Sequence, residues 1–193
     1  LLIIMQDFVH LHVHTQYSLL DGQASVARLV DKAMQNGMKG IAVTDHGNMF
    51  GIKEFTNYVN KKNSGPKGEV KDLKKRIAGI EAGTIECADK EAEIAACKAK
   101  IVEAENKLFK PVIGCEMYVA RRTMDLKEGK PDQSGYHLIV LAKNEKGYHN
   151  LIKLVSHAWT RGYYMRPRTD RSELEKYHEG LIVCSACLGG EVP

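Results

Sequence analysis

Short apolar runs alternate along this chain with segments in which apolar residues recur every three or four positions. The runs occupy residues 8–14, 40–44, 111–119, 137–142 and 181–185. Such alternation is typical of α/β proteins, in which helices connect the strands of a largely parallel sheet. The pattern therefore predicts an α/β fold, and four or five strands with helical crossovers favour part of a barrel over a finished sheet.

Local signals place the helices between these strands. Ser25 is a good N-cap for a helix that Asn36-Gly37 should end. A second helix is expected over 52–60, and Asp170 with Glu173 should cap a short helix. Another helix is expected after residue 142, with a buried face of Leu151, Leu154, Val155, Ala158 and Trp159.

A charged segment, residues 61–110, interrupts the alternation. It holds 12 of the 28 basic and 9 of the 24 acidic residues, and its two apolar ladders step by threes and fours on either side of Gly83. The spacing predicts two helices folded into an antiparallel hairpin. Such a hairpin fits an arm for a partner or for DNA, but we favour a solvated insertion between barrel parts 1–60 and 111–193. Its deletion should leave the site described below intact.

Composition narrows the class of protein. The net charge of +4 gives only a weak indication of a polyanionic partner, because residues outside 61–110 are almost neutral. No apolar stretch approaches the roughly 20 residues of a membrane-spanning helix, so no membrane partner is expected. Five cysteines form an odd set, which favours reduced thiols or metal ligands over disulfides. We therefore expect a cytoplasmic protein.

The first expected strand carries three histidines at every second position. Side chains alternate across a strand, so His10, His12 and His14 should share one face. Three protonated imidazoles would repel one another there, whereas neutral imidazole is a common ligand of zinc, manganese or iron. The pattern therefore predicts a metal site, in preference to three structural histidines.

Other ligand-type side chains stand at or just beyond the ends of the later strands. They are His46, Glu116 and Cys187. Because the carboxyl ends of parallel barrel strands gather on one rim, these residues should converge with the histidines of the first strand. Cys184-Ser-Ala-Cys187 is a single CxxC motif, which alone is weak evidence for a redox pair. Because Cys184 lies within the expected strand and Cys187 beyond its end, we interpret Cys187 as a metal ligand and Cys184 as a packing residue. His137 opens a strand, and the rim argument does not reach it.

A loop rich in aromatic and basic residues precedes the last strand. Arg166, Arg168 and Arg171 follow Tyr163-Tyr164. Such a mixture is typical of nucleic-acid or phosphate contacts, and a loop held together by arginine pairs is an equally good interpretation.

Several motifs are spaced along the chain in a recognisable order. They are His12-Val-His14, Leu20-Asp21-Gly22, Thr44-Asp45-His46-Gly47-Asn48, Gly114-Cys115-Glu116, His137-Leu-Ile-Val-Leu-Ala-Lys143 and Ser185-Ala-Cys187-Leu-Gly. Together they resemble a known family, the N-terminal PHP (polymerase and histidinol phosphatase) domain of bacterial DNA polymerase III alpha subunits. The resemblance covers nearly the whole chain except 61–110, and it implies a distorted (β/α)7 TIM-like barrel, here truncated before its last strands.

The resemblance also implies a site and a reaction. Two or three divalent ions (zinc, manganese or iron) would support hydrolysis of phosphodiester bonds by two-metal chemistry, as a 3′ to 5′ proofreading exonuclease. Glu116, His14 and His46 are the expected catalytic residues. The implied partners are DNA, the rest of a polymerase alpha chain, the clamp and a proofreading subunit. The implied metal ligands are His12, His14, Asp21, His46, Glu116, His137 and Cys187.

One departure from the family pattern concerns the end of the site. The family completes its ligand set with an Asp-x-His pair, which we expect downstream of Pro193 in a longer protein, together with the polymerase (nucleotidyltransferase) carboxylates. Two alternatives stay open. The domain could be a metal-stabilised scaffold without catalysis, or a free-standing PHP phosphoesterase acting on a small phosphate monoester such as histidinol phosphate.

Overall fold

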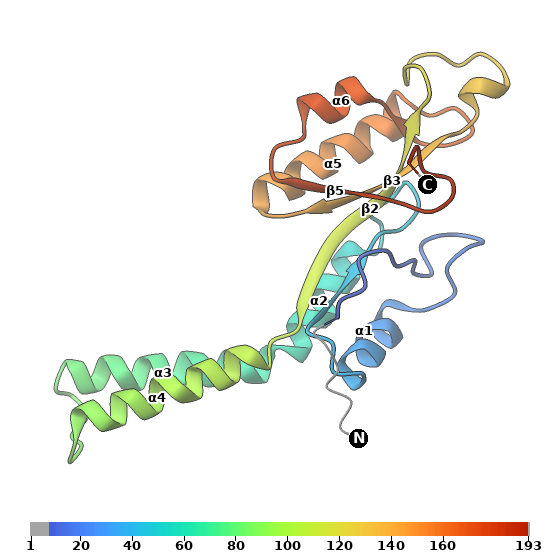
Figure 1. The fold of residues 1–193 in the computed structure, drawn as a ribbon. Coiled ribbons are helices and arrows are strands. Elements are labelled where there is room, and N and C mark those ends of the chain that lie inside the picture. Colours follow the sequence, from blue (N-terminus) through green and yellow to red (C-terminus); the bar gives the residue numbers. More distant parts are fainter. Residues whose placement is uncertain (1–7, 193) are drawn as a thin grey trace. The chain divides into compact units, whose positions relative to one another are not determined.

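The computed structural model describes residues 8–192, and its helices and strands alternate as an α/β protein (Figure 1). The elements confirm the strands expected from residue 40 onward and the helix ends marked by Ser25 and Asn36-Gly37. The helices are α1 (Val26–Gln35), α2 (Ile52–Lys62), α3 (Ser64–Glu81), α4 (Lys90–Asn106), α5 (Glu145–Thr160) and α6 (Arg171–Lys176), with a 3-10 turn η1 (Lys130–Asp132). The strands are β1 (Gly40–Val43), β2 (Lys110–Ala120), β3 (Gly135–Ala142), β4 (Arg168–Thr169) and β5 (Leu181–Ser185).

The chain divides into two compact units. One contains the described residues of Leu1–Thr56 and Pro111–Pro193, and the other is Asn57–Lys110. None of the helices within residues 8–192 is both long and apolar enough to cross a membrane.

The sheet is mixed and, within the described residues, open. Its strand order is β1-β2-β3-β5, and β4 pairs with β2 in parallel. β3 is antiparallel to both β2 and β5, and no α-helix lies in the described residues 121–134 between β2 and β3, which corrects the expectation that helical crossovers join parallel strands at this point. A closed barrel is not formed by these strands, so the fold that the structure establishes is an α/β arrangement on a non-closed sheet.

Helix α5 covers one face of this sheet. Its Leu151, Leu154 and Val155 pack against Cys115, Met117 and Val140 of β2 and β3, and Figure 1 shows α5 and α6 on the same side of β3 and β5. Because strand side chains alternate, Glu116 between Cys115 and Met117 points to the opposite face. The core under α5 therefore fixes the direction of the Glu116 carboxylate.

The end of α5 departs from the predicted core. Leu151, Leu154 and Ala158 are buried as the spacing predicts, but Trp159 is 41% exposed. Its indole Nε1 donates to the carbonyl of Gly47 at 2.7 Å. The buried face of α5 therefore ends at Ala158, one residue before the predicted end at Trp159.

The first expected strand is absent. Residues 8–14 have no continuous ladder, although the Ala42 amide donates to the His10 carbonyl and the Thr44 amide to that of Val13, both at 2.9 Å. The segment thus follows β1 without the strict alternation of a strand. Strand alternation therefore does not place His10 on one face with His12 and His14.

Unit 57–110 contains the predicted helical hairpin. Helices α3 and α4 are joined by a turn at Gly83, whose φ of +72° is a left-handed conformation that glycine adopts without steric cost. Asp89 caps α4 by accepting a hydrogen bond from the Ala92 amide. At the base of the hairpin, the Asn63 side chain pairs with both the amide and the carbonyl of Phe109.

Candidate metal centre

The site is built around one buried carboxylate. Glu116 lies within β2, where only 1% of its side chain is exposed. Its Oε2 lies 2.7 Å from His12 Nε2 and 2.8 Å from His14 Nε2, and its Oε1 lies 2.8 Å from His137 Nδ1. The sequence predicted Glu116 at a strand end, but β2 continues to Ala120. The carboxylate therefore lies on the sheet itself.

The antiparallel register explains why His137 reaches Glu116 from the start of β3. Tyr118 pairs with His137 and Glu116 with Ile139, so His137 is the diagonal neighbour of Glu116 on the same face. Strand β5 returns antiparallel to β3 and ends beside it, with Ser185 opposite Leu138. This topology brings the chain after β5 back to the cluster.

The return of the chain after β5 explains the position of Cys187, two residues beyond the end of that strand. Its Sγ lies 3.4 Å from His137 Nδ1 and 3.8 Å from Glu116 Oε1. Cys184, by contrast, is partly buried and packs beside a cluster of Ala42, Ile139 and Leu141, as the sequence predicted. The two cysteines therefore have different surroundings.

His46 and Asp21 form the other side of the cluster. The turn after β1 is tied to β2, because the Glu116 amide donates to the Asp45 carbonyl and the Gly47 amide to the Glu116 carbonyl. His46 Nε2 lies 2.7 Å from Asp21 Oδ2, and its Nδ1 lies 3.5 Å from Glu116 Oε2. That Nδ1 is buried and has no hydrogen-bond partner among the described residues.

Burial and hydrogen bonding set the charges here. Burial raises the pKa of Glu116, but hydrogen bonds from His14 and His12 outweigh it and lower that pKa to about 2. The same hydrogen bond to Glu116 raises the pKa of His14 above its usual value, whereas burial lowers the pKa of His46. Glu116 is therefore an anion at neutral pH, and His46 is neutral there.

Two further residues orient the ligand-type side chains, and sequence reasoning missed both. The buried Asp45 carboxylate accepts hydrogen bonds from the Thr15 amide, the Thr15 hydroxyl and the Ser18 hydroxyl, at 2.6, 2.8 and 2.8 Å. Ser18 Oγ in turn lies 2.9 Å from His14 Nδ1. Such partners fix the orientation of a histidine. A polar residue in the Thr44-Asp45-His46 turn was visible in the sequence, but nothing signalled Ser18.

The donor set suits a metal centre. Three groups of potential ligand atoms lie within 4.8 Å of one another: His12, His14 and Glu116; His14, Asp21 and His46; and His46, Glu116 and His137. His12 Nε2 and His14 Nε2 lie 3.1 Å apart, and both are close to the same oxygen, Glu116 Oε2. If both imidazoles were protonated they would repel each other, and binding neutral imidazoles to a cation would remove that repulsion. Nitrogen and oxygen donors of this kind fit zinc, manganese or iron.

The remaining predicted residues lie elsewhere. His10 is exposed and contacts Phe8, so the structure removes it from the predicted histidine face. Arg168 is fully buried and donates to the carbonyls of Gly162, Met124 and Leu126, which corrects the prediction that it contacts a nucleic acid. Arg171 is exposed and pairs with Glu191. Arg166 lies over the Tyr118 ring beside the cluster.

Comparison with known proteins identifies the family. A family profile described as PHP domain matches residues 10–102 and 91–193. This chain belongs to the PHP domain family. The match covers every residue of the carboxylate–histidine cluster, so the cluster is part of a PHP domain.

The PHP domain is also similar to curated DNA polymerase III alpha subunits. The subunit of Borreliella burgdorferi is 42% identical over 189 residues, that of Treponema pallidum 40% over 188, and that of Aquifex aeolicus 36% over 191. These matches cover 96 to 97% of this chain but only 12 to 13% of the relatives. The chain thus spans about an eighth of the length of those relatives.

Proposed function

We propose that this PHP domain belongs to a replicative DNA polymerase alpha subunit and removes nucleotides from DNA 3′ ends with bound metal ions. The observation that carries the proposal is the convergence of four histidines, Asp21 and Cys187 around buried Glu116. The similarity to alpha subunits supports the choice of DNA over a small phosphate monoester. Polymerisation itself is assigned to the remainder of such a protein.

In this proposal, the complete set of ligands would hold two or three divalent ions of zinc, manganese or iron. When bound, such ions polarise phosphoryl oxygens and activate water for in-line displacement. The proposed ligands are His12, His14, Asp21, His46, Glu116, His137 and Cys187, with an Asp-x-His pair from a longer chain.

The residues themselves supply charge and oriented donor atoms. Ionised Glu116 gives the site a fixed negative charge in a buried position, which attracts cations and repels a phosphate in their absence. His14 is oriented through Ser18, and burial lowers the pKa of His46, which keeps its imidazole neutral at neutral pH and able to bind a cation. We assign catalytic roles to Glu116, His14 and His46 on this basis.

The proposal extends to architecture and partners. The described sheet would be the first part of a distorted (β/α)7 barrel, with 61–110 as an insertion that leaves the site unaffected. The partners would be DNA, the rest of the alpha chain, the clamp and a proofreading subunit, acting in the cytoplasm.

A nuclease assay tests the proposal. A single-stranded oligonucleotide with a 5′ label is incubated with manganese or zinc and a chain long enough to include the Asp-x-His pair. We expect stepwise shortening from the 3′ end, its loss in His14→Ala and its retention in the His10→Ala control. A metal-loaded long chain that leaves DNA intact would favour the scaffold alternative, and release of phosphate from histidinol phosphate alone would favour a free-standing phosphoesterase.

A further inference from the structure

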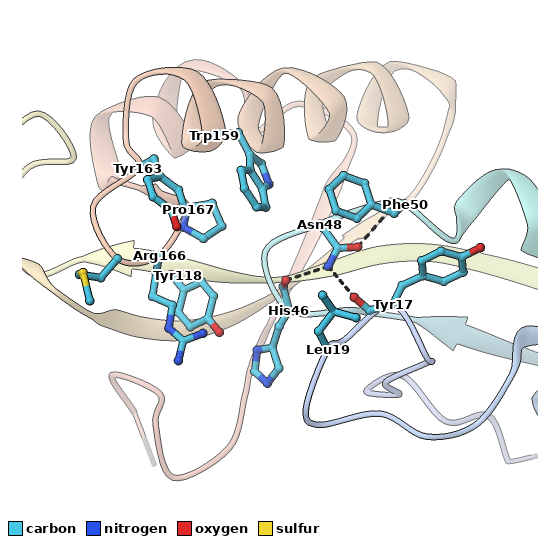
Figure 2. A pocket seen from close by; sticks show the side chains of 11 residues that line it. Tyr17, Leu19, His46, Asn48, Phe50, Tyr118, Trp159, Tyr163, Arg166 and Pro167 are labelled. Atoms are coloured by element: carbon cyan, nitrogen blue, oxygen red, sulfur yellow. Dashed lines mark hydrogen bonds between the residues drawn. The ribbon is translucent and has the colours of Figure 1, made fainter.

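An aromatic cavity opens directly beside the metal centre (Figure 2). It has a volume of about 190 Å³, and the neighbouring polar cavity, which contains Asp21 and His137, has about 330 Å³. Both cavities are lined by Leu19, His46, Tyr118 and Arg166. The two cavities therefore adjoin one another, and we refer to them as the aromatic half and the polar half of a candidate site.

Three exposed aromatic rings form the wall of the aromatic half. Trp159 stacks on Tyr163 with ring centroids 5.6 Å apart and an angle of 21°, and Phe50 lies 5.9 Å from Trp159. These side chains are 41, 48 and 64% exposed, respectively. The hydrogen bond from Trp159 Nε1 to the Gly47 carbonyl fixes the indole. Exposed aromatic rings that cluster at a surface are typical of binding sites, and an indole held in place loses little side-chain entropy when a ligand covers it.

Arg166 supplies the charge that complements this wall. Its guanidinium lies 5.6 Å from the centre of the Tyr118 ring, at the boundary of the two cavities. Within residues 8–192 no carboxylate forms an ion pair with it, in contrast to Arg161 and Arg171. Arg166 is therefore placed to contact an anion that spans both halves.

We propose that the aromatic half binds a base of single-stranded DNA while its neighbouring phosphodiester enters the polar half. Trp159, Tyr163 and Phe50 would provide the stacking surface, and Arg166 would contact the backbone phosphate. The cavity is smaller than the roughly 300–1,000 Å³ of sites that enclose a drug-sized ligand, so it suits one base of a longer strand. Stacking rings beside a cation are the usual means of binding single strands.

This inference rests on the proposed function for the choice of DNA. A base joined to a phosphate could also come from RNA, because the stacking chemistry is shared. The relatives named as DNA polymerase subunits favour DNA, and the test below separates the two.

The chain offers its own reporter, because Trp159 is its single tryptophan. A short single-stranded oligodeoxynucleotide with hydrolysis-resistant phosphorothioate linkages is titrated into the zinc-loaded protein, because bound cations offset the charges of Glu116 and Asp21 at the polar half. Binding is followed by quenching of Trp159 fluorescence and by anisotropy of a label on the DNA. We expect saturable quenching. An oligonucleotide whose terminal nucleotide is abasic should bind about 5- to 150-fold more weakly, the range that stacking of one base supports.

Variants separate stacking from general binding. Phe50→Ala and Tyr163→Ala should each weaken binding by about five-fold or more, and Tyr163→Phe, which keeps the ring, should restore it. Phe8→Ala is the matched control, since Phe8 is 56% exposed but does not line the aromatic cavity. In Tyr163→Ala the penalty for the abasic end should shrink.

Three results would overturn the inference: no quenching, equal binding of the intact and abasic strands, or binding of an RNA strand in preference to DNA. The result of the nuclease assay does not depend on these binding results, so the proposed hydrolysis and the proposed base stacking can fail separately. Quenching without cleavage would refute the proposed hydrolysis and leave base stacking in place, whereas cleavage without any effect of Tyr163→Ala would refute stacking alone.

Discussion

Glu116→Gln is the most informative perturbation of the site. The substitution keeps the shape of the side chain and removes its charge. Glu116 contributes oxygen atoms to two of the three ligand groups, so the change affects both at once. We expect it to abolish most metal-dependent stabilisation of the protein while the metal-free fold persists.

The size of the expected change in Tm follows from the linkage between metal binding and folding. Metal at 100 times its dissociation constant stabilises a folded chain by about 2.7 kcal/mol, which corresponds to a rise in Tm of roughly 5–11 °C for a domain of this size. If Glu116→Gln weakens metal binding about 100-fold, the same metal concentration supplies only about 0.4 kcal/mol, or roughly 1–2 °C. Loss of one supporting partner alone lowers affinity about 10- to 100-fold, so a direct ligand should reach at least that range.

Calorimetry measures the Tm of Glu116→Gln and of a control variant, once in chelator and once with added manganese or zinc. Glu179→Gln is the control, because Glu179 is an exposed carboxylate that pairs only with Lys146 among the described residues. It should keep the full metal-dependent rise in Tm. A full rise in Glu116→Gln would refute the assignment of the carboxylate as a metal ligand.

Three further predictions test separate parts of the structure. His12→Ala should lower both the bound metal per chain and Tm, whereas His10→Ala should leave the metal content unchanged by elemental mass spectrometry; equal losses would restore the three-histidine face. Asp170→Asn should lose about 1–3 kcal/mol in chemical denaturation at pH 7, because the amide cannot replace the oxygen that accepts from the Met124 amide. Burial raises the pKa of Asp170, but hydrogen bonds from the Met124 and Glu173 amides outweigh it and lower that pKa in the folded protein. The stabilisation by Asp170 is therefore present above the usual pKa of a carboxyl group and is lost as the pH falls through the pKa of the folded protein. A stability difference between Asp170→Asn and the unmodified protein that does not shrink below about pH 4 would contradict this account. Replacing residues 64–108 by a short glycine-serine linker should leave metal content unchanged, and loss of metal would show that the hairpin supports the site.

Features specified by neighbouring residues could be predicted from the sequence. The caps at Ser25 and Asp170 and the turn at Gly83 depend on a few adjacent side chains and backbone angles. The alternation of helix and strand patterns likewise identified most elements from residue 40 onward. These signals are local, so they do not depend on how the strands pair.

Strand direction could not be predicted in the same way. His137 begins its strand, and only the antiparallel register of β2 and β3 places it diagonally from Glu116. An apolar run looks the same whether its neighbour is parallel or antiparallel. The resemblance to PHP domains, and not the residue pattern, supplied His137 and Asp21.

Burial of polar side chains was equally hidden. Arg168 stands among aromatic and basic residues typical of a nucleic-acid contact, yet backbone carbonyls surround its guanidinium. His10 shares the spacing of His12 and His14, but the irregular segment turns it away from Glu116. Such outcomes depend on contacts between residues far apart in the sequence.

The most direct test of the metal centre is an anomalous X-ray scattering map of crystals grown with manganese or zinc. The account predicts peaks within bonding distance of the Glu116 carboxylate, shared with His12, His14, His46 or His137. A metal-saturated crystal with no peak at Glu116, or with its peaks elsewhere on the domain, would contradict it.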